Sequence, residues 1–112
     1  RMNMFYREEK LFNYTKMSNY HLKDKNLSLK AKGLFSIILS LPDNWQFSNE
    51  GLCSLCKEGK MAVDTAIKEL KDNGYLKLIR KQNSLGTFYY DYEVYENPHT
   101  QLGHIDLPFT DN

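Results

Sequence analysis

The fold of this chain is decided by residues 47–76, which read FSNEGLCSLCKEGKMAVDTAIKELKDNGYL. Ser48 is a favourable N-cap residue, because its hydroxyl can accept a hydrogen bond from an amide of the first helical turn. Leu52 is placed to contact Phe47 across that helix start as a hydrophobic staple. These residues predict a short helix of about two turns.

In this short helix Leu52, Cys53 and Cys56 form an apolar stripe. A second, longer helix is predicted after the tripeptide Lys57-Glu58-Gly59, which interrupts that stripe. From Lys60 onward, apolar residues recur at the i, i+3, i+4 and i+7 positions of one helix face: Val63, Ala66, Ile67 and Leu70. Asn73 and Gly74 then predict a left-handed C-cap. Two helices joined by a short turn are typical of a helix-turn-helix, whose second helix enters a DNA major groove, and also of purely structural three-helix cores.

A further helix is predicted before this stretch, over residues 28–41. Ser28 is an N-cap candidate, and Pro42 cannot continue a helix. This helix is the first of the three along the chain, and its buried stripe is expected to consist of Ala31, Leu34, Phe35, Ile38 and Leu41. Ile37 and Leu39 widen the apolar arc, which indicates either burial against an N-terminal strand or a dimer contact.

The segments that flank the first helix are less regular. Residues 12–17 favour extended backbone and predict a short strand, and residues 19–26 are polar and turn-like. Residues 42–44 form a turn, after which Trp45 and Phe47 are expected to fold back over the end of the first helix.

The chain continues after Gly74 with a predicted β-hairpin. Leu76 and Leu78 alternate with their neighbours over residues 76–82, and residues 83–87 form a loop that contains glycine. The returning strand has two faces, one with Phe88, Tyr90, Tyr92 and Val94, the other with Tyr89, Asp91, Glu93 and Tyr95. The predicted fold is an α+β winged helix-turn-helix of three helices and a two-stranded β-hairpin wing, with a short N-terminal strand.

Length and composition fit one globular domain. The 112 residues are 41% hydrophobic and 26% charged, which suits a single core. No apolar run approaches the roughly 20 residues that span a membrane, and the polar start is not that of a secretory signal, so a cytoplasmic location is expected. The expected divisions are an N-terminal extension (1–11), the winged helix-turn-helix domain (12–97) and a flexible C-terminal tail or linker (98–112).

The net charge of +1 is unevenly distributed. Residues 1–56 carry 8 basic and 5 acidic side chains, residues 57–81 carry 7 and 4, and residues 82–112 carry none and 5. A weakly basic body can attract phosphate locally even when the whole chain is nearly neutral, so this balance is compatible with nucleic-acid binding.

The chain resembles the N-terminal winged-helix domain of phage and plasmid replication proteins related to DnaD. The similarity covers about residues 14–97 and is carried by the segments 24–34 (DKNLSLKAKGL), 41–45 (LPDNW), 56–60 (CKEGK), 68–70 (KEL) and 74–76 (GYL). The resemblance implies a role in DNA replication initiation, with both DNA binding and self-association. It implies no defined set of contact residues, and the second helical domain that often follows in the family has no counterpart in this sequence.

The predicted DNA-contacting surface combines the outward face of the second helix with the wing. Its residues are Lys57, Lys60, Met61, Asp64, Thr65 and Lys68, followed by Lys81, Asn83, Ser84 and Thr87 in the wing. Lysines neutralise phosphates, Thr65 can bond a phosphate or a base edge, and Asp64 can accept from cytosine N4. The alternative is a solvated face on which Asp64 pairs with Lys60 or Lys68 at i±4.

Further basic residues flank that surface, namely Lys77 and Arg80 near the wing and Lys23, Lys25, Lys30 and Lys32 around the first helix. Cys53 and Cys56 have the CxxC spacing of half a zinc site, but with no further ligands nearby they are expected to fill the core. His21, His99 and His104 are expected to be solvated, so neither a metal nor another cofactor is predicted. The chain has no phosphate-cradling glycine loop, HExxH or GxSxG motif, and no enzymatic activity is expected.

The sequence therefore predicts a domain that binds double-stranded DNA in phage or plasmid replication initiation. The first alternative is a self-association or protein-interaction module of a replisome organiser, which forms a homodimer or higher oligomer, or contacts other replication proteins, through residues 12–17 and the surface of Ile37 and Leu39. The second is a transcriptional regulator, which shares the same chemistry.

Overall fold

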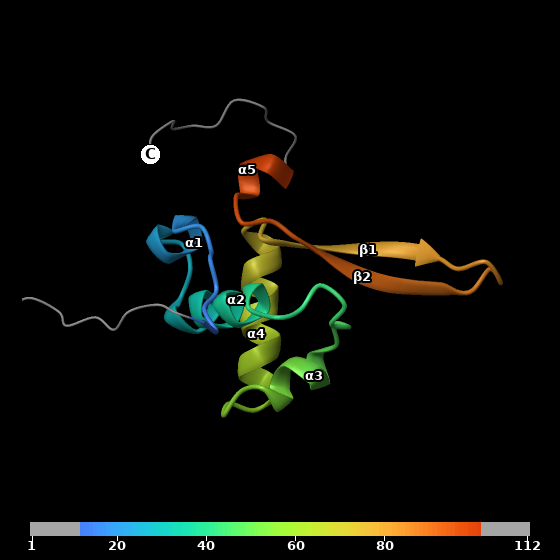
Figure 1. The fold of residues 1–112 in the computed structure, drawn as a ribbon, viewed down its shortest axis with the longest axis horizontal. Helices are drawn as coiled ribbons and strands as arrows, with labels where there is room; N and C mark the ends of the chain where they lie inside the picture. Colours follow the sequence, from blue (N-terminus) through green and yellow to red (C-terminus); the bar gives the residue numbers. More distant parts are fainter. Residues whose placement is uncertain (1–11, 102–112) are drawn as a thin grey trace, which may run out of the picture.

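A computed structural model describes residues 12–101 of the chain. Its elements in order are α1 (Tyr20–Lys23), α2 (Leu29–Leu39), α3 (Asn49–Ser54), α4 (Lys60–Asp72), β1 (Leu76–Gln82), β2 (Phe88–Val94) and α5 (Pro98–Gln101) (Figure 1). Helices α2, α3 and α4 are the three predicted helices, and β1 pairs with β2 as an antiparallel hairpin. The predicted winged helix-turn-helix architecture is confirmed.

Serine caps set the starts of α2 and α3 as predicted. The Ser28 hydroxyl accepts from the Ala31 amide at 3.2 Å, and the Ser48 hydroxyl accepts from the Gly51 amide at 2.9 Å. Both helices end earlier than predicted. Ser40 is the C-cap residue of α2, and its hydroxyl donates to a carbonyl of the last turn. After α3, the turn before α4 spans residues 55–59 rather than three residues.

Gly74 ends α4 in the predicted way. Its φ of 88° lies in the left-handed region, where a side chain would be strained. The reversal lets the Tyr75 amide donate to the Leu70 carbonyl at 2.9 Å, which satisfies a carbonyl of the last turn. The chain then passes directly from the helix into β1.

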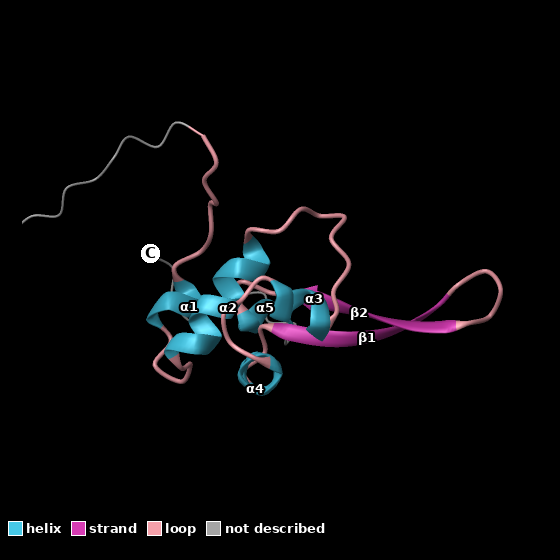
Figure 2. Cartoon of the chain, turned by 90° about the horizontal axis from the view of Figure 1, so that it is seen from below, coloured by secondary structure: helices cyan, strands magenta, loops and turns pink. Residues whose placement is uncertain are grey.

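The core lies where α2, α3 and α4 meet the base of β1, and its buried residues are Leu27, Ala31, Leu34, Phe35, Ile38, Leu52, Val63, Ala66, Ile67, Leu70, Tyr75 and Leu76. All four residues of the predicted α4 stripe are buried, because they share one helix face. Figure 2 views α4 along its axis, with the other helices and the hairpin on one side of it. The opposite side of α4 is therefore exposed.

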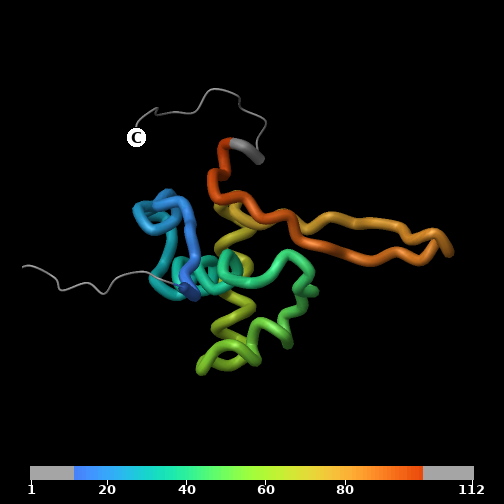
Figure 3. Tube along the Cα trace, in the orientation of Figure 1, coloured from blue at the N-terminus to red at the C-terminus, as the bar shows by residue number. Residues whose placement is uncertain are grey.

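The hairpin leaves this body as a long arm (Figure 3). Only its base packs on the core, where Tyr92 and Val94 are half-buried. Trp45 and Phe47 pack edge-to-face at 5.5 Å between ring centroids, and Phe47 packs in the same way on Tyr92 at 5.7 Å. These two aromatic residues thus lie against the base of the hairpin as well as near the end of α2, with which they line one cavity.

Four expectations are wrong, three of them for the N-terminal part of the chain. Residues 12–17 form no strand, and within the described part of the chain the sheet contains β1 and β2 alone, so these residues have no strand to pair with. Part of the supposed turn 19–26 is helix α1. His21 is fully buried rather than solvated, and His99 is half-buried with its Nε2 3.1 Å from the Tyr20 hydroxyl, while His104 lies outside the described residues.

The hydrogen bonds around His21 fix its tautomer. The Ser36 hydroxyl donates to the Lys32 carbonyl at 2.8 Å, so its oxygen accepts from His21 Nε2 at 2.9 Å. His21 Nδ1 is then an acceptor, and no donor within the described residues reaches it. The ring packs edge-to-face on Phe35, with 4.9 Å between centroids. Burial lowers the pKa of His21, with Glu96 opposing and Lys32 reinforcing that shift.

The buried neutral imidazole predicts a loss of stability in mild acid. Because the folded-state pKa lies below the unfolded value of about 6.5, the unfolded chain binds the extra proton first, so stability is complete above that pH and falls below it. Urea denaturation should therefore show a lower free energy of unfolding at about pH 5.5 than at about pH 7.5. The variant His21→Leu should have a shallower pH dependence whatever its absolute stability. An equal slope in both proteins would contradict this assignment.

Candidate nucleic-acid interface

The exposed side of α4 carries the predicted contact residues. Met61, Thr65 and Lys68 lie in one outward row at i, i+4 and i+7, and Met61 is 83% exposed. Lys60 is exposed beside this row, whereas Asp64 is half-buried. The buried stripe fixes the orientation of the helix, so the structure brings these five side chains together on the surface as the sequence predicted.

Asp64 already has partners for both of its oxygens. Lys60 Nζ donates to Oδ2 at 2.5 Å, and Asn49 Nδ2 of α3 donates to Oδ1 at 2.8 Å. The hydrogen bond from Lys60 is the main reason that the pKa of Asp64 lies below its usual value, and the same bond raises the pKa of Lys60. The alternative interpretation of Asp64 as half of an i, i+4 ion pair is therefore confirmed, with Lys60 as the partner, and Asp64 also links α3 to α4.

Two further predicted lysines have carboxylate partners. Lys68 Nζ lies 2.7 Å from Asp72 Oδ2, and Lys81 Nζ lies 3.3 Å from Asp91 Oδ2. Both of these pairs, and the Lys60 end of the pair with Asp64, are exposed to solvent, where such contacts contribute little stability and are easily exchanged. A phosphate can therefore replace these carboxylates at small cost, although the aspartates left behind reduce the attraction.

Thr65 has a defined polarity. Its hydroxyl donates to the Met61 carbonyl one turn earlier, with 2.8 Å between the oxygens. The hydroxyl proton is thus used inside the helix, and the outward lone pair can only accept. This geometry suits an amino group on a base edge, such as cytosine N4 or adenine N6, better than a phosphate oxygen, which needs a donor.

Asn83 shapes the wing loop. Its Oδ1 accepts from the amides of Leu85 at 2.9 Å and Thr87 at 3.0 Å, and its carbonyl accepts from Gly86, whose φ is 84°. A turn closed by a left-handed glycine is a common hairpin connection. The side chain of Asn83 therefore organises the loop, while Ser84 and Thr87 are exposed.

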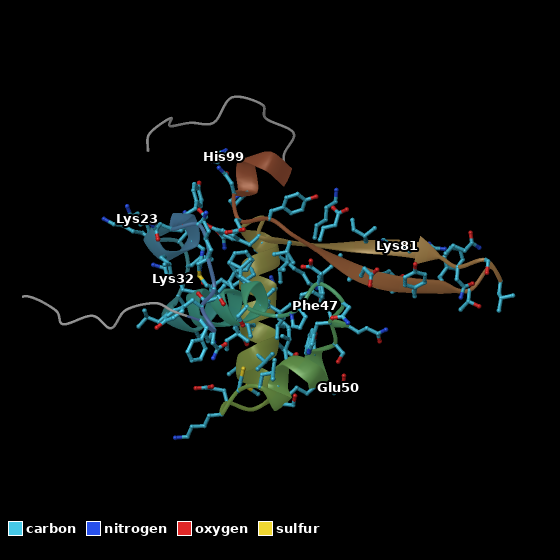
Figure 4. All side chains as sticks on the ribbon, in the orientation of Figure 1. Lys23, Lys32, Phe47, Glu50, Lys81 and His99 are labelled. Carbon is cyan, nitrogen blue, oxygen red and sulfur yellow. The ribbon has the colours of Figure 1, made fainter. Side chains whose placement is uncertain are left out.

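The basic residues are not all on one surface. Lys57 is exposed in the turn before α4, and Lys81 lies on the hairpin arm, but Lys23 and Lys32 lie at the far side of the body (Figure 4). Lys32 Nζ donates to the Leu22 carbonyl there at 3.0 Å. Lys71 was not among the predicted contacts; it is exposed, but its Nζ lies 5.5 Å from the centroid of the Tyr92 ring of β2, so it lies beside the base of the hairpin rather than in the outward row of α4.

Cys53 and Cys56 are half-buried and pack against the core, as expected. Burial is the main reason that the pKa of the Cys56 thiol is raised, so less of the reactive thiolate is present at neutral pH. Within residues 12–101, no three His, Cys, Asp or Glu side chains lie close enough together to hold a metal ion.

Comparison with known proteins supports the architecture. Residues 25–76 match the family model described as a helix-turn-helix domain, and this range runs from the segment before α2 to the start of β1. Searches of curated proteins and of solved structures returned no match. Within the described residues, no helix has the length and apolar character needed to cross a membrane. The chain therefore contains a winged helix-turn-helix domain, and the helix-turn-helix match supports DNA binding as its function.

The pairing of Asp64 with Lys60 predicts that removal of the carboxylate charge strengthens DNA binding. Asp64→Asn keeps an oxygen for Asn49 but releases Lys60, so affinity should rise several-fold for all duplexes, and the salt slope should steepen by about 0.9 for one added phosphate contact. Fluorescence anisotropy over a salt series measures both quantities. Asp43→Asn, in the loop after α2, removes the same charge away from α4 and should change neither. A selective loss of preference for one sequence would instead mean that Asp64 reads a base.

Proposed function

We propose that this domain binds double-stranded DNA, with α4 in the major groove and the wing loop beside the neighbouring backbone. The observation that carries the proposal is the exposed side of α4, which no other described element covers. An α-helix fits the width of the major groove, and a recognition helix reads bases through side chains on such a face. The helix-turn-helix match over residues 25–76 supports the same function.

Different side chains have different proposed roles. Lys57, Lys60 and Lys68 neutralise phosphates, and Lys81 does so from the wing. Met61 and Thr65 are the base readers, Met61 through apolar contact with a thymine methyl group. Ser84 and Thr87 are proposed to bond the backbone from the wing loop, whose shape Asn83 maintains. Asp64 is proposed to limit affinity rather than to read cytosine.

We further propose that the duplex belongs to an origin of phage or plasmid replication. The resemblance of segments such as 24–34 and 41–45 to replication initiation proteins supports this choice. A transcriptional regulator would use the same α4 surface, so the distinction rests on which duplexes bind: repeated sites at an origin, or a site that overlaps a promoter.

Charge reversal on α4 tests the binding surface. Lys68→Glu should weaken binding to every duplex, and Lys68→Ala should lower the salt slope by about 0.9, because one phosphate contact is lost. Thr65→Ala should instead reduce the preference for a cognate over a random duplex, by about 1–3 kcal/mol. Lys23→Glu is the matched control, since Lys23 is exposed at the far side of the body. The helix-in-groove proposal fails if Lys23→Glu weakens binding as much as Lys68→Glu does.

A second candidate function is self-association through α2. Leu39 packs against the core, whereas Ile37 lines a half-open groove of about 190 Å³ between α2 and the start of α4. The groove has small residues, Gly33, Ala62 and Ala66, along its walls and leaves room for an apolar side chain of a second copy.

Sedimentation velocity tests this candidate. If α2 is a dimer contact, the intact chain should show concentration-dependent association that Ile37→Lys abolishes, because a charge would be buried at the contact. Leu29→Lys serves as a control, since Leu29 is 87% exposed on the same helix and does not line the groove. A monomer at all concentrations removes the candidate.

A further inference from the structure

The two faces of the hairpin differ in chemistry. The pairing register places directly opposite residues on one face, here called the aromatic face: Leu78 with Tyr92, Arg80 with Tyr90 and Gln82 with Phe88. The other face carries Lys77, Ile79, Lys81, Tyr89, Asp91 and Glu93. Both carboxylates of the hairpin, those of Asp91 and Glu93, therefore lie away from the aromatic face.

The outer part of the aromatic face is not used by the core. Tyr92 at the base is covered by Phe47, but farther along the arm Phe88 is 49% exposed and Tyr90 is 58% exposed. Leu78 is also exposed. Neighbouring exposed apolar side chains on a projecting arm are unusual in a protein without a partner for them, because water contact with apolar surface is unfavourable. Folding of the body does not explain this surface.

Cations accompany these rings. The Arg80 guanidinium lies 3.7 Å from the centroid of the Phe88 ring. This cation–π contact positions the planar guanidinium group on the aromatic face. At the base, Lys71 Nζ of α4 lies 5.5 Å from the centroid of the Tyr92 ring. The aromatic face therefore combines ring surfaces with positive charge at both ends, and the hairpin supplies no carboxylate there.

We propose that the aromatic face binds unpaired nucleotides of a single-stranded nucleic acid, with bases stacked on Tyr90 and on the Arg80–Phe88 pair and with phosphates near Arg80 and Lys71. Exposed aromatic rings beside arginine or lysine are what single-strand binding surfaces use, since every base has a stacking face and every linkage an anionic phosphate. A purely apolar protein partner would bury the Arg80 charge without compensation, so the charge on this face favours nucleic acid.

The inferred activity goes beyond the proposed duplex binding and uses different residues. In a duplex, the faces of the bases are stacked on one another and cannot reach Tyr90. The two activities therefore require separate substrates, and α4 variants and aromatic-face variants should affect them independently.

Fluorescence anisotropy with a labelled oligothymidine of about 15 nucleotides tests the inference on the full chain. An abasic strand of the same length has the same phosphates but no bases, so it should bind at least about tenfold more weakly. Tyr90→Ala should weaken oligothymidine binding about tenfold or more, and Arg80→Lys should weaken it too, because charge is kept but the stacking plane is lost. An oligouridine arm shows whether the preferred strand is DNA or RNA.

Tyr89→Ala is the matched control, since Tyr89 is the adjacent residue, is 44% exposed and lies on the opposite face. Tyr89→Ala should leave oligothymidine affinity unchanged. Lys68→Glu should reduce duplex affinity but should not change the ratio between oligothymidine and abasic-strand affinity. Equal binding of the abasic strand, or equal effects of Tyr89→Ala and Tyr90→Ala, would overturn the inference. So would sedimentation showing self-association that Tyr90→Ala abolishes in a chain that binds no single strand. Absence of duplex binding alone would refute only the proposed function.

Discussion

The position of Tyr75 is the constraint on which the other elements depend. Its side chain is completely buried, its ring packs on Phe35 at 5.1 Å, and its hydroxyl donates to Asp24 at 2.7 Å. Its amide closes α4, and its carbonyl accepts from the Tyr95 amide after β2. One residue thus connects the segment before α2, the end of α4 and both strands of the hairpin. Burial, and then the bond to Asp24, raise the pKa of the phenol, which stays neutral.

Much of the fold was predictable because local rules determine it. The apolar period of α4, the serine caps and Gly74 each act within one or two helical turns, and the hairpin follows from alternation and a glycine loop. The failures concern residues whose structure depends on distant partners. Residues 12–17 favour a strand, but within the described residues neither β1 nor β2 pairs with them. His21 is buried because it packs on Phe35 and forms a hydrogen bond with Ser36, both in α2.

In the candidate site, too, the features set by local pattern were predictable and those set by contacts between elements were not. The sequence correctly places Met61, Thr65 and Lys68 on the surface, since orientation follows from the buried stripe. It does not reveal that Asn49 of α3 holds Asp64, because that contact forms only when α3 packs on α4. Nor does strand alternation alone show which part of the hairpin the body leaves uncovered.

The hairpin is anchored at one end only, which has a consequence for its dynamics. A two-stranded hairpin without a packed face is marginally stable in water, so the outer rungs of the arm should open locally far more often than the base near Tyr75. Amide hydrogen exchange would therefore be graded along β1 and β2, slow at Leu76 and fast toward Gln82. A molecule bound to the arm would slow amide exchange there and leave exchange in the helices unchanged. The exchange rates of the outer rungs therefore report whether the arm is occupied.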